Sequence, residues 1–433
     1  MRALIQIRPS ADLFAAVADP SVTVAPSEVA GDLPGFELDS GFDPFSIPHP
    51  TDSLVVIRGE VGDDDLDNTL SQLSGISSEH RSVAGVFADP RIESTITCGD
   101  TPAVGTGQDV QKLFRTDELA AAGMDGHGVA LAIVDTGINV AKVQQVHGGQ
   151  VNIDTQRSWN PPGVTGTAGQ FPVAHGSMCA YDALLSAPQA ALLDLPVLQS
   201  KKQGQTQMDG LLSDALAAYN HLRTVLTDQP EATRSLVVTN SWGAFSPDWD
   251  FPVGQPGNYS DNPNHPFNVI VGSLEQAGAD ILFAAGNCGR DCPDSRCAYK
   301  DHPIGGANSH PSVLTIGGVD TKGQRVGYSS QGPGRLSDKK PDVCSYTHFL
   351  GSTVFGANDP DTGTSAACPV AAGLVTAIRA VHPASKLSPA QLRSLLQSTA
   401  AAQPGGFNYD YGYGTLDTGK ILAELQKNAA TRA

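Results

Sequence analysis

Positive charge is scarce in this sequence. Its 27 Lys and Arg are outnumbered by 45 Asp and Glu, which gives 433 residues a formal net charge of −18 at pH 7. Nucleic acids and anionic membrane surfaces are themselves negative, so this balance argues against both as partners. Long apolar runs are missing as well, since no stretch approaches the about 18 residues that a membrane-spanning helix needs. The sequence therefore predicts no nucleic-acid partner and no membrane partner.

A signal peptide is also not apparent. Met1-Arg2 is followed by only Ala3, Leu4 and Ile5 before polar residues resume, which is too short for the apolar core of a signal peptide. We therefore expect a cytoplasmic location, with secretion by another route left open. Aromatic residues make up only 6% of the chain, and its seven cysteines do not settle the redox compartment. The hydrophobic content of 40% is nevertheless enough for one large globular domain and a smaller one.

The first hundred residues predict a small α+β domain. Val55 to Ile57 and Val83 to Ala88 are typical of strands. Between them, Asp63 to Asp65 are suited to cap a short helix that presents Leu66, Leu70 and Leu73 on one face. The segment from Cys98 to Asp109 is rich in Gly, Thr and Pro, as linkers are. We therefore divide the chain into an N-terminal domain, 1–105, and a second domain, 106–433.

The second domain alternates apolar runs with helical patterns. Four runs predict buried parallel strands: Val129 to Val134, Leu236 to Val238, Ile281 to Ala285, and Val313 to Val319. Three helices are predicted: an apolar stripe from Met208 to Leu226, the run from Ala366 to Val381, and one that starts at Ser388-Pro389. This alternation predicts a doubly wound α/β fold with a mostly parallel sheet. In such sheets ligands bind beyond the carboxyl ends of the strands, where Asp135, Asn240 and Asn287 fall.

Three residues have the chemistry of a nucleophilic hydrolase. A serine hydroxyl needs a base to take its proton, and that base is an imidazole held in the right tautomer by a carboxylate. Asp135, His175 and Ser365 occur in the chain order of subtilisin, which differs from that of chymotrypsin and of the α/β-hydrolases. Asn287 follows a predicted strand and is suited to donate to the oxyanion, together with the Ser365 backbone N–H. Singly, Asp135 reads as a turn residue and Ser365 as a helix N-cap, but together the four predict a catalytic site.

The segments around these residues resemble the subtilase family (subtilisin-like serine peptidases, S8). The matching segments are Ala132 to Ile138, His175-Gly176-Ser177, Asn240 to Gly243, Ala284 to Asn287, Gly363 to Pro369, and the closing Tyr411 to Asp417. The resemblance implies a serine endopeptidase that acts on polypeptides, with Ser241, Trp242, Gly243, Ala285 and Gly286 binding the substrate.

The same resemblance suggests a role for the N-terminal domain. In position, size and α+β pattern it is similar to the family's inhibitory propeptide, although its sequence match is weak. Two interpretations are open: an intramolecular inhibitor that is removed by cleavage between about Ser94 and Asp109, or a permanent domain that recognises a partner. The first is favoured.

Several features depart from the family pattern. The short link from Ser186 to Ala190 leaves no room for the loop that holds tight calcium in many members, so no cofactor is expected, with weak calcium binding left open. Residues 244–264 form a polar insertion expected beside the substrate site. Cys288, Cys292 and Cys297 are open to three interpretations: a disulfide between two of them, a metal site, or free thiols. Cys179 and Cys368 are expected to be small buried residues.

Rival hypotheses are weaker. Asp135-Thr136-Gly137 and Asp361-Thr362-Gly363 resemble the two carboxylate loops of aspartic proteases, but the polar turn before Asp361 and the helix after it contradict that fold. We therefore expect Asp361 to lie in a surface turn. His147 is a poor base because a glycine pair follows it. A non-catalytic scaffold that binds peptides is the alternative from another functional class, and the intact set Asp135, His175, Asn287 and Ser365 argues against it.

Overall fold

The computed structural model of the protein describes residues 1–19, 21–47, 53–62, 66–77, 81–94, 97, 101–201, 208–299 and 301–432, with backbone only for 428–432. Among these residues no helix has both the length and the hydrophobicity to cross a membrane.

An antiparallel sheet occupies the N-terminal part of the chain. Its described strands are β1 (Arg2–Pro9), β2 (Phe36–Leu38), β3 (Phe45–Ile47), β4 (Leu54–Val61) and β5 (Arg81–Ala88), with β1 between β4 and β5. Helices α1 (Ala11–Ala18), α2 (Pro26–Ala30) and α3 (Leu66–Ser74) accompany it. The two predicted strands lie within β4 and β5, and the predicted helix is α3, whereas its predicted cap, Asp63 to Asp65, is outside the described residues.

A parallel sheet forms the centre of the rest of the chain. In the described residues its order is β14-β13-β12-β11-β7-β9-β8, and every neighbouring pair is parallel. The strands are β7 (Ala130–Val134), β8 (Asn152–Ile153), β9 (Ala191–Leu195), β11 (Leu236–Asn240), β12 (Ala279–Ala284), β13 (Leu314–Val319) and β14 (Val343–Tyr346). Each of the four predicted apolar runs is one of them. The doubly wound, mostly parallel α/β fold is thereby confirmed.

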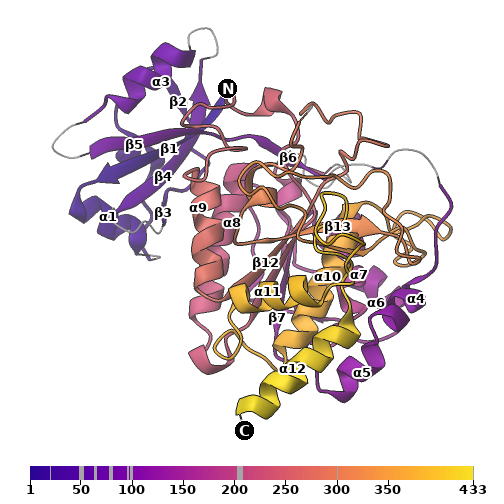
Figure 1. Ribbon diagram of the computed structural model, residues 1–433. Helices are drawn as coiled ribbons and strands as arrows, with labels where there is room; N and C mark the ends of the chain where they lie inside the picture. The colour runs from indigo at the N-terminus through magenta and orange to yellow at the C-terminus, as the bar shows by residue number, and fades with distance from the viewer. Residues whose placement is uncertain are drawn as a thin grey trace.

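Helices cover both faces of this sheet (Figure 1). They are α4 (Gly107–Leu113), α5 (Thr116–Ala121), α6 (Val140–His147), α7 (His175–Leu184), α8 (Leu212–Thr227), α9 (Pro266–Gln276), α10 (Thr364–Arg379), α11 (Pro389–Thr399) and α12 (Thr418–Arg432). Side chains of β7 point alternately to the two faces: Leu131 and Ile133 join the core that holds α7 and α10, and Ala132 and Val134 join the core that holds α8 and α9. Both faces of the strand are thus buried, as its continuous apolar run predicts.

One predicted helix begins later than expected. The apolar stripe predicts a helix from Met208, but α8 begins at Leu212, and Asp209–Leu211 form strand β10 instead. Strand β10 pairs antiparallel with β6 (Arg91–Glu93), and Gly210 at its centre lowers the helix propensity locally. Pairing with a distant segment therefore overrides the helical periodicity here.

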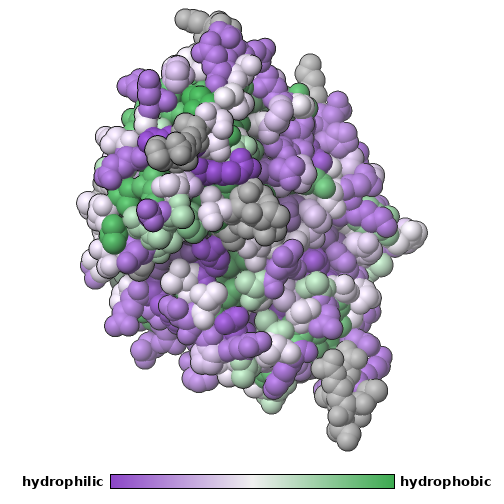
Figure 2. Space-filling model, turned by 90° about the vertical axis from the view of Figure 1, so that its left-hand side faces the viewer, coloured by the Kyte–Doolittle hydropathy of each residue, from purple (hydrophilic) through white to green (hydrophobic). Residues whose placement is uncertain are grey.

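The N-terminal sheet packs against α8 and α9. Leu4, Phe42 and Phe87 share one apolar cluster with Leu212 and Phe267, so the interface is continuous with the core. Figure 2 shows the molecule from this side, where hydrophilic residues predominate and hydrophobic ones form separate patches. On the face shown, the surface is thus mostly hydrophilic.

The charged centre of this interface is Arg58. Its Nη1 atom donates to Asp214 Oδ1 at 2.8 Å and to Ser213 Oγ at 3.0 Å, and its Nε atom donates to Asp39 Oδ2 at 2.9 Å. Burial raises the pKa of Asp214, while the Arg58 charge opposes that rise. Because Arg58 is itself only 8% exposed, the guanidinium and its carboxylates depend on one another.

Candidate active site

Asp135 and His175 meet at the carboxyl end of the parallel sheet. Asp135 follows β7 directly, and its Oδ1 and Oδ2 atoms lie 2.8 and 3.0 Å from His175 Nδ1. The Thr136 N–H donates to Asp135 Oδ1 at 2.7 Å, which fixes the carboxylate. Both side chains are buried, so their contact is shielded from water. The imidazole therefore has one nitrogen held and the other, Nε2, directed away from the carboxylate.

The position of His175 is set by the start of α7. His175 is the first residue of this helix, and the Gly176 N–H donates to Thr136 Oγ1 at 2.8 Å. A Cβ at Gly176 would lie 2.6 Å from the Gly137 carbonyl oxygen, so a side chain there would push the helix away from Asp135. His-Gly is thus required by close backbone packing as well as by chemistry.

A second carboxyl supports the loop that follows Asp135. Asp194 on β9 accepts hydrogen bonds from the Ile138 N–H at 3.1 Å and the Gly169 N–H at 2.8 Å. Its complete burial raises the pKa of Asp194 to about 7. Asp194 was not predicted from the sequence, because one Asp within an apolar strand gives no sign of which backbone groups it binds.

Ser365 lies at the start of α10, the helix at the centre of the core. It is the second residue of this helix, and the N-cap is Gly363, so its interpretation as an N-cap is wrong. Gly363 has φ of +81°, a conformation that favours glycine, and a Cβ there would also lie 2.9 Å from Asn287 Nδ2. The Ser365 carbonyl accepts from Ser241 Oγ at 3.0 Å. The candidate nucleophile, Ser365, is thus positioned by the turn at Gly363 and by the hydrogen bond from Ser241.

Asn287 is oriented by the residue before Ser365. Its Oδ1 atom accepts from the Thr364 N–H at 2.9 Å and from Thr364 Oγ1 at 3.0 Å. Because the oxygen is engaged in this way, the Nδ2 end of the amide is turned toward Gly363. The predicted oxyanion donor and the predicted nucleophile are therefore adjacent.

Ser94, from the N-terminal part of the chain, lies between the base and the nucleophile. Its Oγ atom is 2.9 Å from His175 Nε2 and 3.1 Å from Ser365 Oγ, and the residue is completely buried. The preceding strand β6 is held by β10 on one side and by Gly243 on the other. Nothing in the sequence around Ser94 indicates this contact.

The five predicted substrate-binding residues line one pocket. Ser241, Trp242, Gly243, Ala285 and Gly286 surround it, together with small residues and Phe245. Trp242 contributes backbone rather than its ring, since its indole N–H donates to the Val134 carbonyl at 2.9 Å within the core. The pocket adjoins the site, because the Gly286 N–H donates to Thr364 Oγ1 at 3.0 Å.

The structure shows whether four cysteines near the site are bonded or free. Cys288 and Cys297 form a disulfide with Cα atoms 5.7 Å apart, so the metal and free-thiol interpretations of these two are wrong. Cys179 and Cys368 are buried, as predicted. Burial raises the pKa of Cys368 to about 12 and that of Cys179 well above its usual value. Asp135, His175 and Cys179 could present three ligand atoms to a metal, but the thiol is protonated and the imidazole Nδ1 is already engaged.

Asp361 is not in a surface turn, contrary to our expectation. It is 1% exposed and accepts from the Ser352 N–H and hydroxyl. Burial raises the pKa of Asp361 to about 6. Burial, with the neighbouring Asp361, also raises the pKa of Asp182 on α7 well above its usual value. Asp361 therefore belongs to a buried carboxyl pair that joins α7 to the segment before Ser365.

Comparisons with known proteins agree with this geometry. The model of the subtilase family matches residues 126–414. Human membrane-bound transcription factor site-1 protease is 30% identical over 169 residues, which cover 36% of this chain but only 15% of that protein. Subtilisin DY of Bacillus licheniformis is 26% identical over 304 residues, 69% of this chain and 93% of that one.

Solved structures show the same fold. Fervidolysin from Fervidobacterium pennivorans, described as a keratinolytic enzyme related to subtilisin, aligns with a TM-score of 0.61 at 14% identity over 98% of this chain and 60% of its own. MycP1 from the ESX-1 type VII secretion system aligns with a TM-score of 0.51 at 19% identity, over 76% of this chain and 90% of its own.

Proposed function

Since the chain belongs to the subtilase family, we propose that it is a serine endopeptidase that hydrolyses polypeptides through an acyl-enzyme on Ser365. The observation that carries the proposal is the contact of Asp135 with His175 Nδ1, together with one hydroxyl, that of Ser94, within 2.9 Å of His175 Nε2 and 3.1 Å of Ser365 Oγ. Because His175 Nε2 and Ser365 Oγ both lie within hydrogen-bond distance of the Ser94 hydroxyl, the proposed base and the proposed nucleophile lie close together in one site.

In the proposed reaction the Ser365 hydroxyl attacks the scissile carbonyl and His175 Nε2 takes its proton. Asp135 holds the other nitrogen protonated and stabilises the imidazolium that forms. His175 then returns the proton to the leaving amine, the C–N bond breaks, and the acyl group remains on Ser365. Water, deprotonated by the same imidazole, then attacks the acyl carbonyl; the C–Oγ bond breaks, His175 returns the proton to Ser365 Oγ, and the acid product is released.

We assign the oxyanion to Asn287 Nδ2 and the Ser365 backbone N–H. The hydrogen bonds from Thr364 to Asn287 Oδ1 support this, since they preorganise the amide before substrate arrives. The backbone of Ser241, Trp242 and Gly243 would pair with the substrate strand, and Ala285 and Gly286 would border the side chain before the cut.

The N-terminal residues 1–105 are proposed to be an intramolecular inhibitor. Supporting this, strand β6 occupies the path between β10 and Gly243, and the Ser94 hydroxyl engages both His175 and Ser365. The Ser94 carbonyl accepts from Arg296 Nη2 at 3.1 Å, so it is not directed to the oxyanion donors. We therefore propose that cleavage occurs between Thr95 and Asp109, and not at the bond between Ser94 and Thr95.

Activity is proposed not to require tight calcium in the link between α7 and β9. The residues there fit such a site poorly: Ala187 and Ala190 are buried, Ser186 is 3% exposed, and the link contains no carboxylate.

A fluorophosphonate probe tests the function, because it reacts only with an activated serine. We expect labelling of the chain after limited proteolysis has removed residues 1 to about 105, and none of Ser365→Ala treated identically. Labelling that is absent from the processed wild type would contradict the peptidase and favour a non-catalytic peptide-binding scaffold.

A further inference from the structure

Strand β6 directs its neighbouring side chains to opposite sides of the site. The Glu93 N–H donates to the Gly243 carbonyl at 3.0 Å, and the Gly243 N–H donates to the Glu93 carbonyl at 2.9 Å. On its other edge, β6 pairs with β10 in the register Gly210 with Ile92. Alternate residues of a strand face opposite sides, so Ile92 points one way and Glu93 the other. Ile92 enters the apolar core, as expected for isoleucine.

Glu93 is buried although its side chain is charged. It is 2% exposed, and its carboxylate pairs with the guanidinium of Arg296 and with that of Arg91. A buried carboxylate without a cation is strongly disfavoured. Arg91 belongs to the same strand as Glu93, so it would leave with that strand, whereas Arg296 belongs to the peptidase. Arg296 is thus the cation that the site itself provides.

Arg296 is held in place from its own side. Asp294, which is 3% exposed, accepts from Arg296 Nη2 at 2.7 Å and from its Nε at 3.1 Å. The guanidinium also lies over the Phe245 ring, 5.1 Å from its centre. Phe245 comes from the insertion 244–264, so the insertion that was expected beside the substrate site reaches this position.

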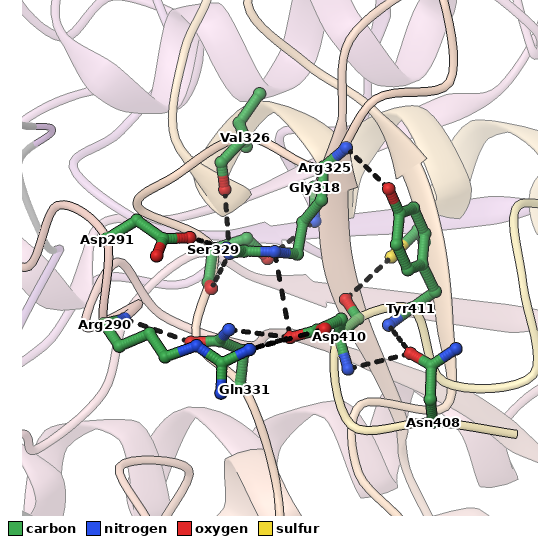
Figure 3. Close-up of polar contacts among 11 residues, drawn as sticks. Arg290, Asp291, Gly318, Arg325, Val326, Ser329, Gln331, Asn408, Asp410 and Tyr411 are labelled. Carbon is green, nitrogen blue, oxygen red and sulfur yellow. Dashed lines mark hydrogen bonds and ion pairs between the residues drawn. The ribbon is translucent and has the colours of Figure 1, made fainter.

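The loop that carries Arg296 is anchored at both ends. The Cys288–Cys297 disulfide closes it, and the Asp294 N–H donates to the Asn287 carbonyl at 2.8 Å. At the far end, Arg290 Nη2 donates to Asp410 Oδ1 at 3.0 Å, within the network of Figure 3. Arg296 is therefore preorganised next to the substrate path, while Arg290 in the same loop points to the C-terminal segment.

The register relates Glu93 to the bond that is cut. The Ser94 carbonyl accepts from Arg296 Nη2 at 3.1 Å, so in a substrate that takes the same register we place the scissile bond one residue beyond the counterpart of Ser94. In a substrate that follows the path of β6, the counterpart of Glu93 is the third residue before the scissile bond.

We infer that Arg296 makes this peptidase selective for polypeptides with an acidic residue three positions before the cut. The inference rests on the proposed function and adds the substrate class to it. A glutamate there receives a charge-assisted hydrogen bond from a guanidinium that is already oriented, whereas a lysine meets like charge.

The test uses the full chain after self-cleavage and three quenched fluorescent peptides that differ only in having Glu, Gln or Lys at the third position before the cut. We expect kcat/KM for the Glu peptide to exceed that for Gln by about 10-fold, the size of one hydrogen bond to a charged group, and that for Lys by more. Arg296→Gln should abolish this preference and Arg296→Lys retain part of it. Arg290→Gln, the matched control, should leave it intact.

Fluorophosphonate labelling in parallel separates the two proposals, because the probe has no third residue. A labelled wild type that cleaves the Glu and Gln peptides equally would overturn the role of Arg296 and leave the peptidase standing. An Arg296→Gln enzyme that is labelled normally and still prefers Glu would overturn it as well. A wild type that is neither labelled nor active would overturn both. A further measurement on the uncleaved chain does not require self-cleavage. There Glu93→Gln should be labelled by the fluorophosphonate faster than wild type, and an equal rate would count against the Glu93–Arg296 contact.

Discussion

Removing the Arg58 guanidinium should open the active site from a distance. Arg58 sits in the N-terminal sheet and bonds Asp214 and Ser213 of α8 at 2.8 and 3.0 Å. Arg58→Ala leaves the carboxylate of Asp214, which is 2% exposed, without the cation that is hydrogen-bonded to it. Breaking a buried pair in this way costs about 3–5 kcal/mol. Since about 1.4 kcal/mol corresponds to a factor of ten, the docking equilibrium should weaken by roughly two to three and a half orders of magnitude.

If β6 enters the active site only while the sheet is docked, the open fraction of the chain rises by the same factor. The assay is the rate of fluorophosphonate labelling of the uncleaved chain, which should increase until opening is no longer limiting. Glu60→Gln is a matched control in the same sheet, because its partner Arg2 lies 3.3 Å away and the Glu60 side chain is 56% exposed, so the pair contributes little. Asp214→Asn added to Arg58→Ala should recover part of the docking, since it neutralises the stranded carboxylate.

Folding is checked in the Ser365→Ala background by circular dichroism, so that self-digestion does not interfere. A folded Arg58→Ala chain that labels at the wild-type rate would refute the coupling, because Ser94 would then stay in place without the docked sheet.

Three further outcomes are expected. Asn287→Ala should lower kcat by about 10²- to 10³-fold with little change in KM, the size known for the oxyanion-hole asparagine of subtilisin, and an unchanged kcat would remove Asn287 from the oxyanion site. Burial raises the pKa of Asp361 to about 6 and that of Asp182 well above its usual value, so the stability that the pair contributes is greatest below the unfolded pKa near 4. The contribution of Asp361 is lost as pH rises through 6, and that of Asp182 as pH rises through its own raised pKa. Asp182→Asn should therefore stabilise the Ser365→Ala protein more at pH 8 than at pH 4 in thermal melts, and the reverse order would contradict the pair. Chelation by EDTA should leave peptidase activity within about twofold, and a loss that added calcium restores would contradict the proposed independence from tight calcium.

The catalytic candidates could be located from sequence because each lies in a short, locally determined setting. Asp135 directly follows a buried apolar strand, His175-Gly176 begins a helix that needs a glycine, and Asn287 lies shortly after another strand. Parallel strands bring their carboxyl ends to one edge, so these local signals imply proximity without any knowledge of tertiary contacts. The roles of the four residues remain predictions, although the structure brings the residues together.

What the sequence could not predict depends on partners far along the chain. Ser94 meets His175 and Ser365 across 81 and 271 residues, and no local pattern encodes either contact. The residues of strand β10 were predicted to be helical from their local periodicity. The segment that pairs with them, β6, lies in the N-terminal part, so no local pattern indicates it. Asp361 was expected at the surface because its neighbours are polar, whereas the Ser352 hydrogen bonds that allow its burial come from another turn.

The two proposals about β6 give Glu93 different roles. As part of an inhibitor, the Glu93–Arg296 pair holds the strand in the site, so weakening it speeds opening. In the proposal about specificity, the pair indicates which substrate residue Arg296 prefers three positions before the cut. That preference does not depend on residue 93 once strand β6 has left the site. Glu93→Gln should therefore change the labelling rate of the uncleaved chain but not the peptide preference of the processed enzyme. Arg296→Gln should change both, because Arg296 is the half of the pair that stays with the peptidase.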